Sequence, residues 1–336
     1  MSVTSEDRTH GSSHYTAREV PAVYRVPTVA EDVAAGFAET PKRLPPKYFY
    51  DDYGSRLFDQ ICDTPEYYPM RTEGGLLAES AAAIMASVKP AHILELGSGT
   101  SRKTEYLLAA AEEQGLSPRY WPYDVCESIM ASAAERLLER FPWLSIEALV
   151  GDYGAGLAHL PRPEGGCLYL FLGGSLGNFE PHEAVRVLGE LAEHMHPQDR
   201  LLLGVDRVKD RAVLEAAYDD AAGVTAAFNR NVLTVLNREL DADFDPDGFA
   251  HESFFNEAAS RIEMHLVARR DQRVRIGALG QDYEFPAGER LRTEISRKFT
   301  PASLASELAS AGLAMSEHYQ PADGAFSLVL VAPANR

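Results

Sequence analysis

The sequence is poor in cysteine and has a deficit of basic charge. Its 336 residues include three cysteines, and 32 basic side chains stand against 50 acidic ones, which gives a formal net charge of −18. A nucleic-acid-binding protein needs a basic face to neutralise phosphates, so this balance argues against that class. Cys62, Cys126 and Cys167 are widely spaced, which fits reduced thiols in a cytoplasmic protein better than a disulfide framework.

Long apolar runs are also absent, and no run approaches the roughly 20 residues of a membrane helix. Residues 1–15 lack the basic and apolar regions of a secretory signal, so we expect a disordered tail there. His194 and His196 have no further ligand type nearby, so we predict no metal site. The composition, 45% hydrophobic and 24% charged, is that of a globular protein of about two domains.

Strand-like and helical stretches alternate through the middle of the chain. Apolar runs lie at residues 92–96, 119–124, 145–150, 167–173 and 200–206, and helical segments separate them except between the third and fourth runs. This alternation predicts βαβ units and therefore an α/β fold with a doubly wound, mostly parallel sheet. Ligands of such sheets bind beyond the carboxyl ends of the strands.

The pattern changes on both sides of this region. Residues 42–69 are rich in proline and tyrosine and indicate a long irregular arm, while residues 209–240 look helical throughout and residues 251–299 contain strand-like stretches. A closing helix and two strands, near residues 313–319 and 326–332, are expected to extend the sheet edge in antiparallel fashion.

These observations predict two domains with a ligand cleft between them. The first is a nucleotide-type domain of residues 71–208 plus 299–336. The second is an α+β domain of residues 16–70 plus 209–298.

The turn ELGSGTSRKT follows the first predicted strand and opens a helix, which is the context of a glycine-rich ligand loop. Gly97 and Gly99 allow the backbone to approach a ligand closely. Arg102 stands where a dinucleotide fingerprint has its third glycine, and the loop lacks the Gly-Lys-Ser/Thr of a phosphate-binding P-loop. A nucleotide-like ligand without a pyrophosphate, such as S-adenosylmethionine, fits this loop.

Carboxylates follow the next two predicted strands. Asp124 ends the second strand, where it can accept hydrogen bonds from both hydroxyls of a ribose. Asp152 and Tyr153 follow the third strand and offer a carboxylate and a ring to adenine. The three positions together strengthen the prediction of a nucleotide-type ligand.

The segment FLGGSLGN, residues 171–178, allows two interpretations. Its G-x-S-x-G pattern is that of a hydrolase nucleophile elbow at Ser175, for which chain order permits Asp206 and His318 as partners. However, an elbow needs its helix directly after the serine, whereas Pro181 marks the expected helix start. The alternative is a glycine-rich strand end that brings the backbone against the transferred group, with the Asn178 amide aimed into the cleft.

Together these stretches resemble the S-adenosylmethionine-dependent histidine Nα-methyltransferases of ergothioneine biosynthesis. The resemblance runs from about Lys42 to the C-terminus, over PPKYFYDDYGSRLFDQICDTPEYYPMRTE, ELGSGTSRKT, FLGGSLGN, YDDAAGVTAAFNRNVL, SRIEMHLVAR and TEISRKF. It implies a Rossmann-like class I methyltransferase domain with a substrate-binding second domain, and trimethylation of L-histidine to hercynine. A methyltransferase of another amino acid such as tryptophan, a hydrolase using Ser175 and a non-catalytic cofactor sensor are the alternatives.

The resemblance also implies site residues. Tyr50 is the implied catalytic residue, near the cofactor's methionine moiety and the substrate amine, where it would help the amine proton to leave. The implied cofactor-binding residues are Gly97, Lys103, Asp124, Asp152 and Tyr153. The implied substrate-binding residues are Tyr67, Gly173, Asn178, Tyr218, Met264, Glu294 and Ser296.

Within that set, Asn178 and Tyr218 would hold the substrate carboxylate, and Glu294 and Ser296 would each pair with one imidazole nitrogen. Periodicity alone would instead place Met264 in the core and Glu294 on a solvated face. Gly174, Ser175 and Arg297 depart from the family pattern. We expect a small amino acid as the partner, no nucleic acid or membrane, and a monomer.

Overall fold

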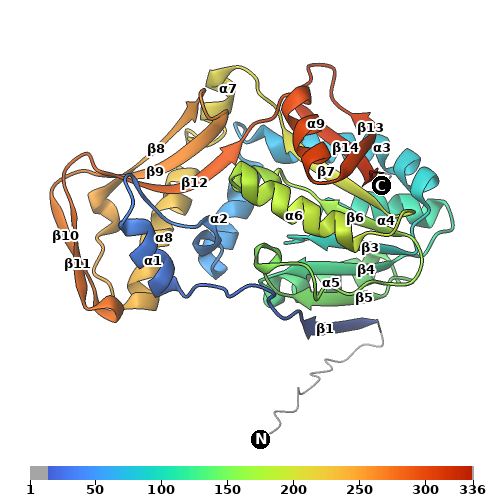
Figure 1. The fold of residues 1–336 in the computed structure, drawn as a ribbon, viewed down its shortest axis with the longest axis horizontal. Coiled ribbons are helices and arrows are strands. Elements are labelled where there is room, and N and C mark those ends of the chain that lie inside the picture. Colours follow the sequence, from blue (N-terminus) through green and yellow to red (C-terminus); the bar gives the residue numbers. More distant parts are fainter. Residues whose placement is uncertain (1–13, 335–336) are drawn as a thin grey trace, which may run out of the picture.

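The structure, a computed structural model, describes residues 14–334, and its largest sheet has eight strands (Figure 1). The strand order is β1-β5-β4-β3-β6-β7-β14-β13. The five central strands are parallel: β3 (His92–Leu96), β4 (Arg119–Asp124), β5 (Ile146–Val150), β6 (Cys167–Phe171) and β7 (Arg200–Asp206). The prediction of a doubly wound, mostly parallel sheet is therefore confirmed.

Helices cover both faces of this sheet, and the strands show why. Leu168 and Leu170 of β6 face the core under α3 (Tyr68–Val88), α4 (Thr104–Glu113) and α5 (Glu127–Arg140). Tyr169 and Phe171 of the same strand face the other core, under α6 (Pro181–His194) and α9 (Pro301–Ser310). Successive side chains point to opposite faces, so a strand covered on both faces must be apolar throughout. Within residues 14–334 no helix has the length and apolarity that a membrane crossing requires.

The two edges of the large sheet differ in how well the sequence predicted them. β14 (Phe326–Pro333) pairs antiparallel with β7, and β13 (Leu313–Tyr319) pairs antiparallel with β14, as predicted. β1 (Tyr15–Glu19) pairs in parallel with β5, so these residues belong to the large sheet and to neither the predicted tail nor the predicted second domain. The strand is half-exposed and carries no apolar run, which left no signal for it. The rest of the predicted tail, residues 1–13, lies outside the described residues.

The strand order reverses direction between β3 and β6. The chain runs outward from β3 through β4 to β5, and then returns to place β6 on the other side of β3. The loops that leave β3 and β6 consequently diverge at this point and open a crevice at the carboxyl ends of the strands. Both glycine-rich turns of the sequence, after Leu96 and after Phe171, begin there.

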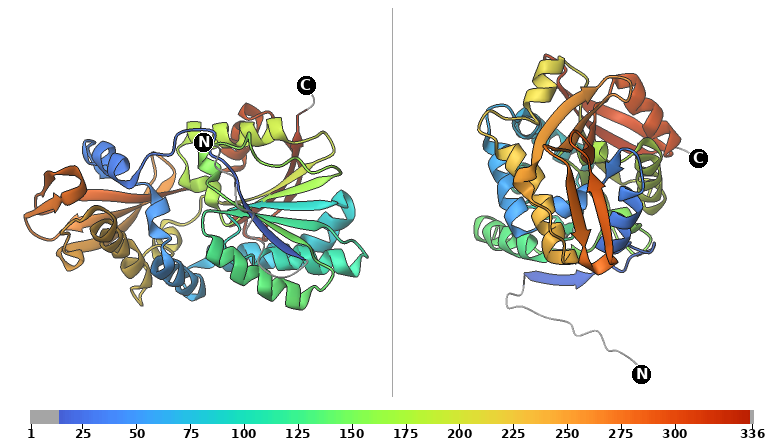
Figure 2. Two further views of the ribbon diagram at one scale, coloured as in Figure 1. Left: turned by 90° about the horizontal axis from the view of Figure 1, so that it is seen from below. Right: turned by 90° about the vertical axis from the view of Figure 1, so that its left-hand side faces the viewer.

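A smaller sheet with its own core lies beside the carboxyl ends of the large sheet (Figures 1 and 2). Its strand order is β2-β12-β9-β8, and a hairpin of two further strands extends from it. The elements are α1 (Val29–Phe37), β2 (Lys42–Arg43), α8 (Val224–Leu240), β8 (Phe249–Asn256), β9 (Arg261–Ala268), β10 (Gln272–Ile276), β11 (Gln281–Phe285) and β12 (Arg290–Arg297). A separate core is what the predicted second domain requires, although the domain boundaries stay a prediction.

The proline- and tyrosine-rich arm is not irregular. It contains a short 3-10 helix at Pro46–Phe49 and then α2 (Asp52–Asp63), which packs against α8. The Asp51 side chain accepts a hydrogen bond from the Gly54 amide at 2.8 Å and so caps the start of α2. Tyr50 lies between the two helices, and this cap therefore fixes the backbone next to it.

The region predicted to be helical throughout, residues 209–240, is broken. α7 (Arg211–Ala216) ends before a turn, and α8 begins at Val224. The Asp220 carboxylate accepts from the Val224 amide at 2.9 Å and from the Thr225 amide at 2.7 Å, which starts the second helix. Gly223 has a φ of 74°, a conformation that interrupts a helix.

Two helical glycines give a matched test of this packing. A Cβ at Gly54 would lie 1.7 Å from the Phe49 carbonyl oxygen, whereas a Cβ at the exposed Gly75 of α3 has nothing within 4 Å. We expect Gly54→Ala to lower the free energy of unfolding by about 1–3 kcal/mol. Gly75→Ala should raise it by roughly 0.5–1 kcal/mol, because alanine favours the helix. Urea unfolding measures both changes, and equal effects would contradict the Gly54 contact.

Candidate active site

A cavity of about 1230 Å³ lies between the carboxyl ends of the large sheet and the smaller sheet. It is lined by the predicted site residues except Met264, namely Tyr50, Tyr67, Gly97, Lys103, Asp124, Asp152, Tyr153, Gly173, Asn178, Tyr218, Glu294 and Ser296. These residues come from distant parts of the chain, so the fold brings them together in one place.

The loop after β3 holds Asp124 in position. The Gly99 amide donates to Asp124 Oδ2 at 2.9 Å, and the Cys126 amide donates to Oδ1 at 3.0 Å. Burial raises the pKa of Asp124, although these backbone bonds oppose the shift. Each carboxylate oxygen keeps a free lone pair for a ligand hydroxyl. A Cβ at Gly99 would meet nothing within 4 Å, so space remains there for a ligand.

Tyr153 packs against the other side of this loop. Asp152 accepts from the Gly154 amide at 2.7 Å and so caps the short turn that carries the tyrosine. A Cβ at Gly97, which has a φ of 68°, would lie 3.3 Å from the Tyr153 ring. The ring also meets Phe171 edge-on, with 5.4 Å between centroids. Glycine at position 97 therefore permits the close approach of an aromatic ring that forms one wall of the cavity.

Glu73 of α3 is a site residue that the sequence reasoning missed. It is fully buried, pairs with Lys103 Nζ at 2.6 Å, and accepts from the Gly173 amide at 2.9 and 2.8 Å. Gly204 of β7 makes room for it, because a Cβ there would lie 1.8 Å from Glu73 Oε1. Glu73 thus ties the start of α4 to the turn after β6. A single glutamate in a helical segment gave no sign of this contact.

Aromatic side chains form the wall opposite the large sheet. Tyr50 meets Phe228 and Phe58 at 5.8 and 5.7 Å between ring centroids, and Tyr67 meets Tyr218 at 6.1 Å. Burial raises the pKa of Tyr50 well above its ordinary value. Its hydroxyl is therefore neutral near pH 7. The catalytic role of Tyr50 stays a prediction.

β12 presents Glu294 and Ser296 to the cavity from one face, because residues two apart on a strand point the same way. Burial raises the pKa of Glu294 to about 7, with Lys298 and Asn178 opposing the shift. The Asn178 amide donates to Glu294 Oε1 at 3.4 Å. Ser296 Oγ lies 2.8 Å from the Tyr218 hydroxyl.

Two of the residues that depart from the family pattern have structural explanations. Arg297 is buried and donates to both Glu307 oxygens, at 2.8 and 2.7 Å, and its neighbouring Glu294 and Ser296 face the cavity instead. Gly174 has a φ of 68° at the start of the turn after β6. A Cβ at the nearby Gly177 would lie 2.9 Å from the Arg297 carbonyl oxygen, so this turn is pressed against β12.

Met264 does not line the cavity. It is 1% exposed and packs in the core of the smaller sheet, directly opposite Glu294 in the β9–β12 register. β9 runs between β8 and β12, so neither backbone edge of this strand is free. The core position that periodicity indicates is therefore correct. Residues opposite each other in the register share a face of the sheet, so Met264 lies on the same face as Glu294, and its contact with the substrate stays a prediction.

The hydrolase interpretation is wrong. Ser175 Oγ donates to the Leu172 carbonyl at 3.0 Å. His318 bonds Ser327 Oγ at 2.9 Å, and Asp206 is paired with two lysines. No base reaches Ser175 among the hydrogen bonds of residues 14–334, so the triad does not form.

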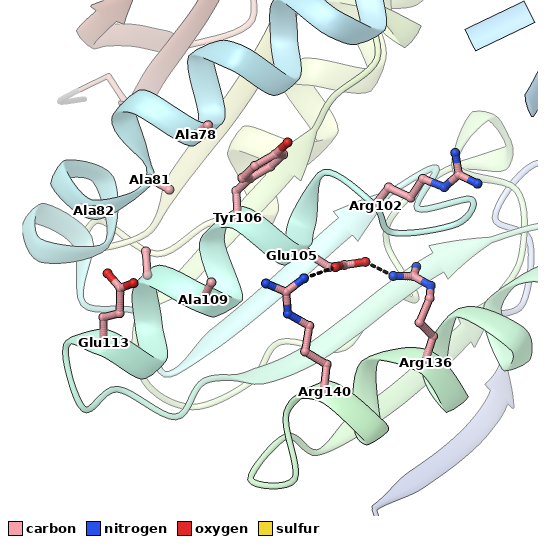
Figure 3. Close-up of a pocket in the computed structure, with 11 residues that line it drawn as sticks. Ala78, Ala81, Ala82, Arg102, Glu105, Tyr106, Ala109, Glu113, Arg136 and Arg140 are labelled. Carbon is pink, nitrogen blue, oxygen red and sulfur yellow. Dashed lines mark hydrogen bonds and ion pairs between the residues drawn. The ribbon is translucent and has the colours of Figure 1, made fainter. Parts of the chain in front are cut away.

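A second groove, of about 560 Å³, lies outside this site between α3, α4 and α5 (Figure 3). Arg136 and Arg140 both reach Glu105, and Arg140 does so at 2.8 Å. Alanines of α3 and α4 form its floor. It contains none of the predicted site residues, so the first cavity is the candidate active site.

The chain is similar to several known proteins. The histidine N-alpha-methyltransferase of Mycobacterium tuberculosis (strain CDC 1551 / Oshkosh) is 47% identical over 301 residues, which cover 90% of this chain and 94% of that protein. The protein of the same name from Mycolicibacterium smegmatis is 48% identical and covers 89% of this chain and 93% of its own. The solved CcbJ methyltransferase of Streptomyces caelestis is 16% identical, with a TM-score of 0.44 over 76% of this chain and 95% of its own.

The sequence pattern of one protein family, described as "Histidine-specific methyltransferase, SAM-dependent", matches residues 29–333. This range contains every predicted site residue and both sheets except β1. The chain therefore belongs to the family of S-adenosylmethionine-dependent, histidine-specific methyltransferases.

Proposed function

We propose that the protein trimethylates the α-amino group of free L-histidine to hercynine, a step of ergothioneine biosynthesis. The observation that carries this proposal is one cavity that holds both a cofactor-type loop with Asp124 and the Glu294–Ser296 pair on β12. The names of the relatives above support the same substrate and the same amino group.

The residues at the large-sheet end of the cavity fit S-adenosylmethionine, which supplies an electrophilic methyl group when bound. Asp124 has free lone pairs for ribose hydroxyls, and Tyr153 offers a buried ring face with Asp152 beside it. Gly97 gives backbone access, while Lys103 fixes the cavity wall through Glu73.

At the other end, Asn178 would donate to the substrate carboxylate, beside the backbone of Gly173 and the rings of Tyr67 and Tyr218. The neutral Tyr50 hydroxyl would accept an N–H of the amine and so orient the amine lone pair. Alignment of this lone pair is the main requirement of a displacement at carbon, so no protein nucleophile is needed. The quaternary product has no lone pair left, and methylation stops after three rounds.

The ring subsite favours imidazole over indole. Glu294 can accept from a ring N–H, and Ser296 can pair with the second ring nitrogen. An indole has one N–H and no acceptor nitrogen, so tryptophan would leave Ser296 without its partner at a buried site. This is the reason to prefer histidine to the tryptophan alternative.

We also propose that the protein acts as a cytoplasmic monomer. One chain supplies every residue of the candidate active site, and its three cysteines are free thiols, which suits a reducing compartment. The predicted division, residues 71–208 plus 299–336 and residues 16–70 plus 209–298, is kept with β1 moved to the first part. Light scattering on the purified protein measures the oligomeric state.

Incubation with S-adenosylmethionine and a panel of free amino acids tests the substrate. We expect histidine to gain three methyl groups by mass, and Glu294→Ala to lower kcat/KM for histidine by about 1.5–3 kcal/mol, roughly tenfold to a hundredfold or more. Tryptophan should gain relative to histidine in this variant. A wild-type preference for tryptophan would reject histidine as the substrate, and a loss below about twofold would reject the role of Glu294.

Asp124→Ala tests the cofactor end. Loss of a charged acceptor should weaken binding of S-adenosylhomocysteine by about 1.5–3 kcal/mol in calorimetry. Asp282→Ala is the matched control, because Asp282 is exposed in the β10–β11 hairpin and pairs with Arg273 there. Equal affinities for the two variants would remove Asp124 from the cofactor site.

The raised pKa of Glu294 predicts a pH dependence of histidine binding. Below pH 7 the carboxyl is mostly protonated, and it becomes an acceptor as the pH rises through about 7. Histidine affinity should therefore increase between pH 6 and 8, measured with S-adenosylhomocysteine present. Glu294→Gln should retain only the part of the slope that comes from the histidine ring itself, which titrates near 6.5. An identical slope in the variant would show that Glu294 does not titrate against the ligand.

A further inference from the structure

Lys298 lies directly beneath the ring subsite and has no solvent exposure at its side chain. Its ammonium lies 2.9 Å from Asp206 Oδ2, 3.0 Å from the Tyr218 hydroxyl and 3.0 Å from Ser296 Oγ. An ammonium has three protons and no lone pair, so these three acceptors use its full capacity. Sequence reasoning did not single out this lysine.

The charge of Lys298 is secured by Asp206. Burial disfavours the charged lysine, but Asp206 and Tyr218 together outweigh burial, and the pKa of Lys298 is raised above its ordinary value. Asp206 in turn accepts from Lys209 and, at 2.6 Å, from the Tyr68 hydroxyl. Both lysines lower the pKa of Asp206 against the effect of its burial. The ion pair therefore persists across the neutral range.

The Ser296 and Tyr218 hydroxyls each accept a hydrogen bond from Lys298, which occupies one lone pair of each oxygen. Ser296 and Tyr218 are also 2.8 Å apart, so one of them donates to the other. Their two hydroxyl protons then divide into one for this bond and one that is free. The hydroxyl that accepts this bond has then accepted twice, once from Lys298 and once from its neighbour. Its own proton is left for a ligand in the cavity that both side chains line.

We infer that Lys298 is a specificity-determining residue that acts through Ser296, making this hydroxyl a donor to the substrate ring so that the site takes the neutral imidazole. The inference rests on the proposed function and deepens it. Glu294, on the same face of β12, accepts the ring N–H, while Ser296 donates to the unprotonated nitrogen. An imidazolium has no acceptor for Ser296, and an indole has none either.

Lys298→Met and Lys209→Met form a matched pair. Each removes one lysine from Asp206, but only Lys298 touches Ser296 and Tyr218. The readout is the ratio of kcat/KM for histidine to that for β-(2-thienyl)alanine, which has a similar ring without nitrogen. We expect the ratio to fall about tenfold or more in Lys298→Met and to stay unchanged in Lys209→Met. A structural role alone would slow both substrates equally, and an unchanged ratio in Lys298→Met would overturn the inference.

A double-mutant cycle with Ser296→Ala tests whether Lys298 acts through the serine. In the Ser296→Ala background, Lys298→Met should change the substrate ratio by less than about twofold, because the hydroxyl that it orients is gone. If the two substitutions instead multiply in full, Lys298 does not work through Ser296 and the inference fails.

Wild-type protein supplies a test that requires no variant to fold. Histidine with nitrogen-15 in the ring is bound together with S-adenosylhomocysteine at pH 7, where about a quarter of the free ring is protonated and about half of Glu294 is ionised. Nitrogen chemical shifts should show one protonated and one unprotonated nitrogen in the bound ring. Two protonated nitrogens would overturn the inference. Failure of the wild type to methylate histidine at all would reject the proposed function instead, so the two failures are distinguishable.

Discussion

The structure depends on a buried ion pair that joins its two sheets. Asp206 ends β7 of the large sheet, and Lys298 follows β12 of the smaller sheet. Their side chains pair at 2.9 Å, and the Phe299 amide donates to the Asp206 carbonyl at 2.8 Å beside them. The cavity lies between these two strands. The ion pair and the hydrogen bond that join the strand ends therefore set its dimensions. A shift of either sheet would separate Asp124 from Glu294.

A second buried carboxylate, Glu73, holds together the elements on the large-sheet side of the cavity. Glu73 connects α3 to Lys103 at the start of α4 and to the turn after β6. The glycine-rich turns have little side-chain packing of their own, and positive φ values at Gly97, Gly99 and Gly173 leave them without an intrinsic preference for one shape. Hydrogen bonds that the Gly99 and Gly173 amides donate to Asp124 and Glu73 select that shape before any ligand arrives. Preorganisation of this kind reduces the entropy that substrate binding would otherwise cost.

The sequence predicted those parts of the fold that follow from local pattern. The strand–helix rhythm of residues 92–206 and the glycine turns were visible because apolar periodicity and turn residues act over short distances. β1 was not predicted, because it pairs with β5, more than a hundred residues away, and carries no apolar run. Glu73 and Lys298 were missed for the same physical reason, because a charged residue is buried only when a distant partner compensates it. Met264 shows the opposite case, in which periodicity alone placed the residue correctly.

The ion pair beneath the ring subsite is better explained by its effect on the direction of neighbouring hydroxyl protons than by any contribution to the stability of the fold. Removing two charges from water is costly, and well-packed apolar side chains in the same volume often stabilise a protein as much or more. Apolar side chains, however, would leave the Ser296 and Tyr218 hydroxyls free to rotate and to accept as readily as they donate. An ammonium with all three protons engaged removes that freedom. A site that distinguishes a ring nitrogen with a lone pair from one with a proton needs hydroxyl protons of fixed direction. The buried pair of Asp206 and Lys298 fixes the direction of two such protons, which explains why the protein keeps it despite its desolvation cost.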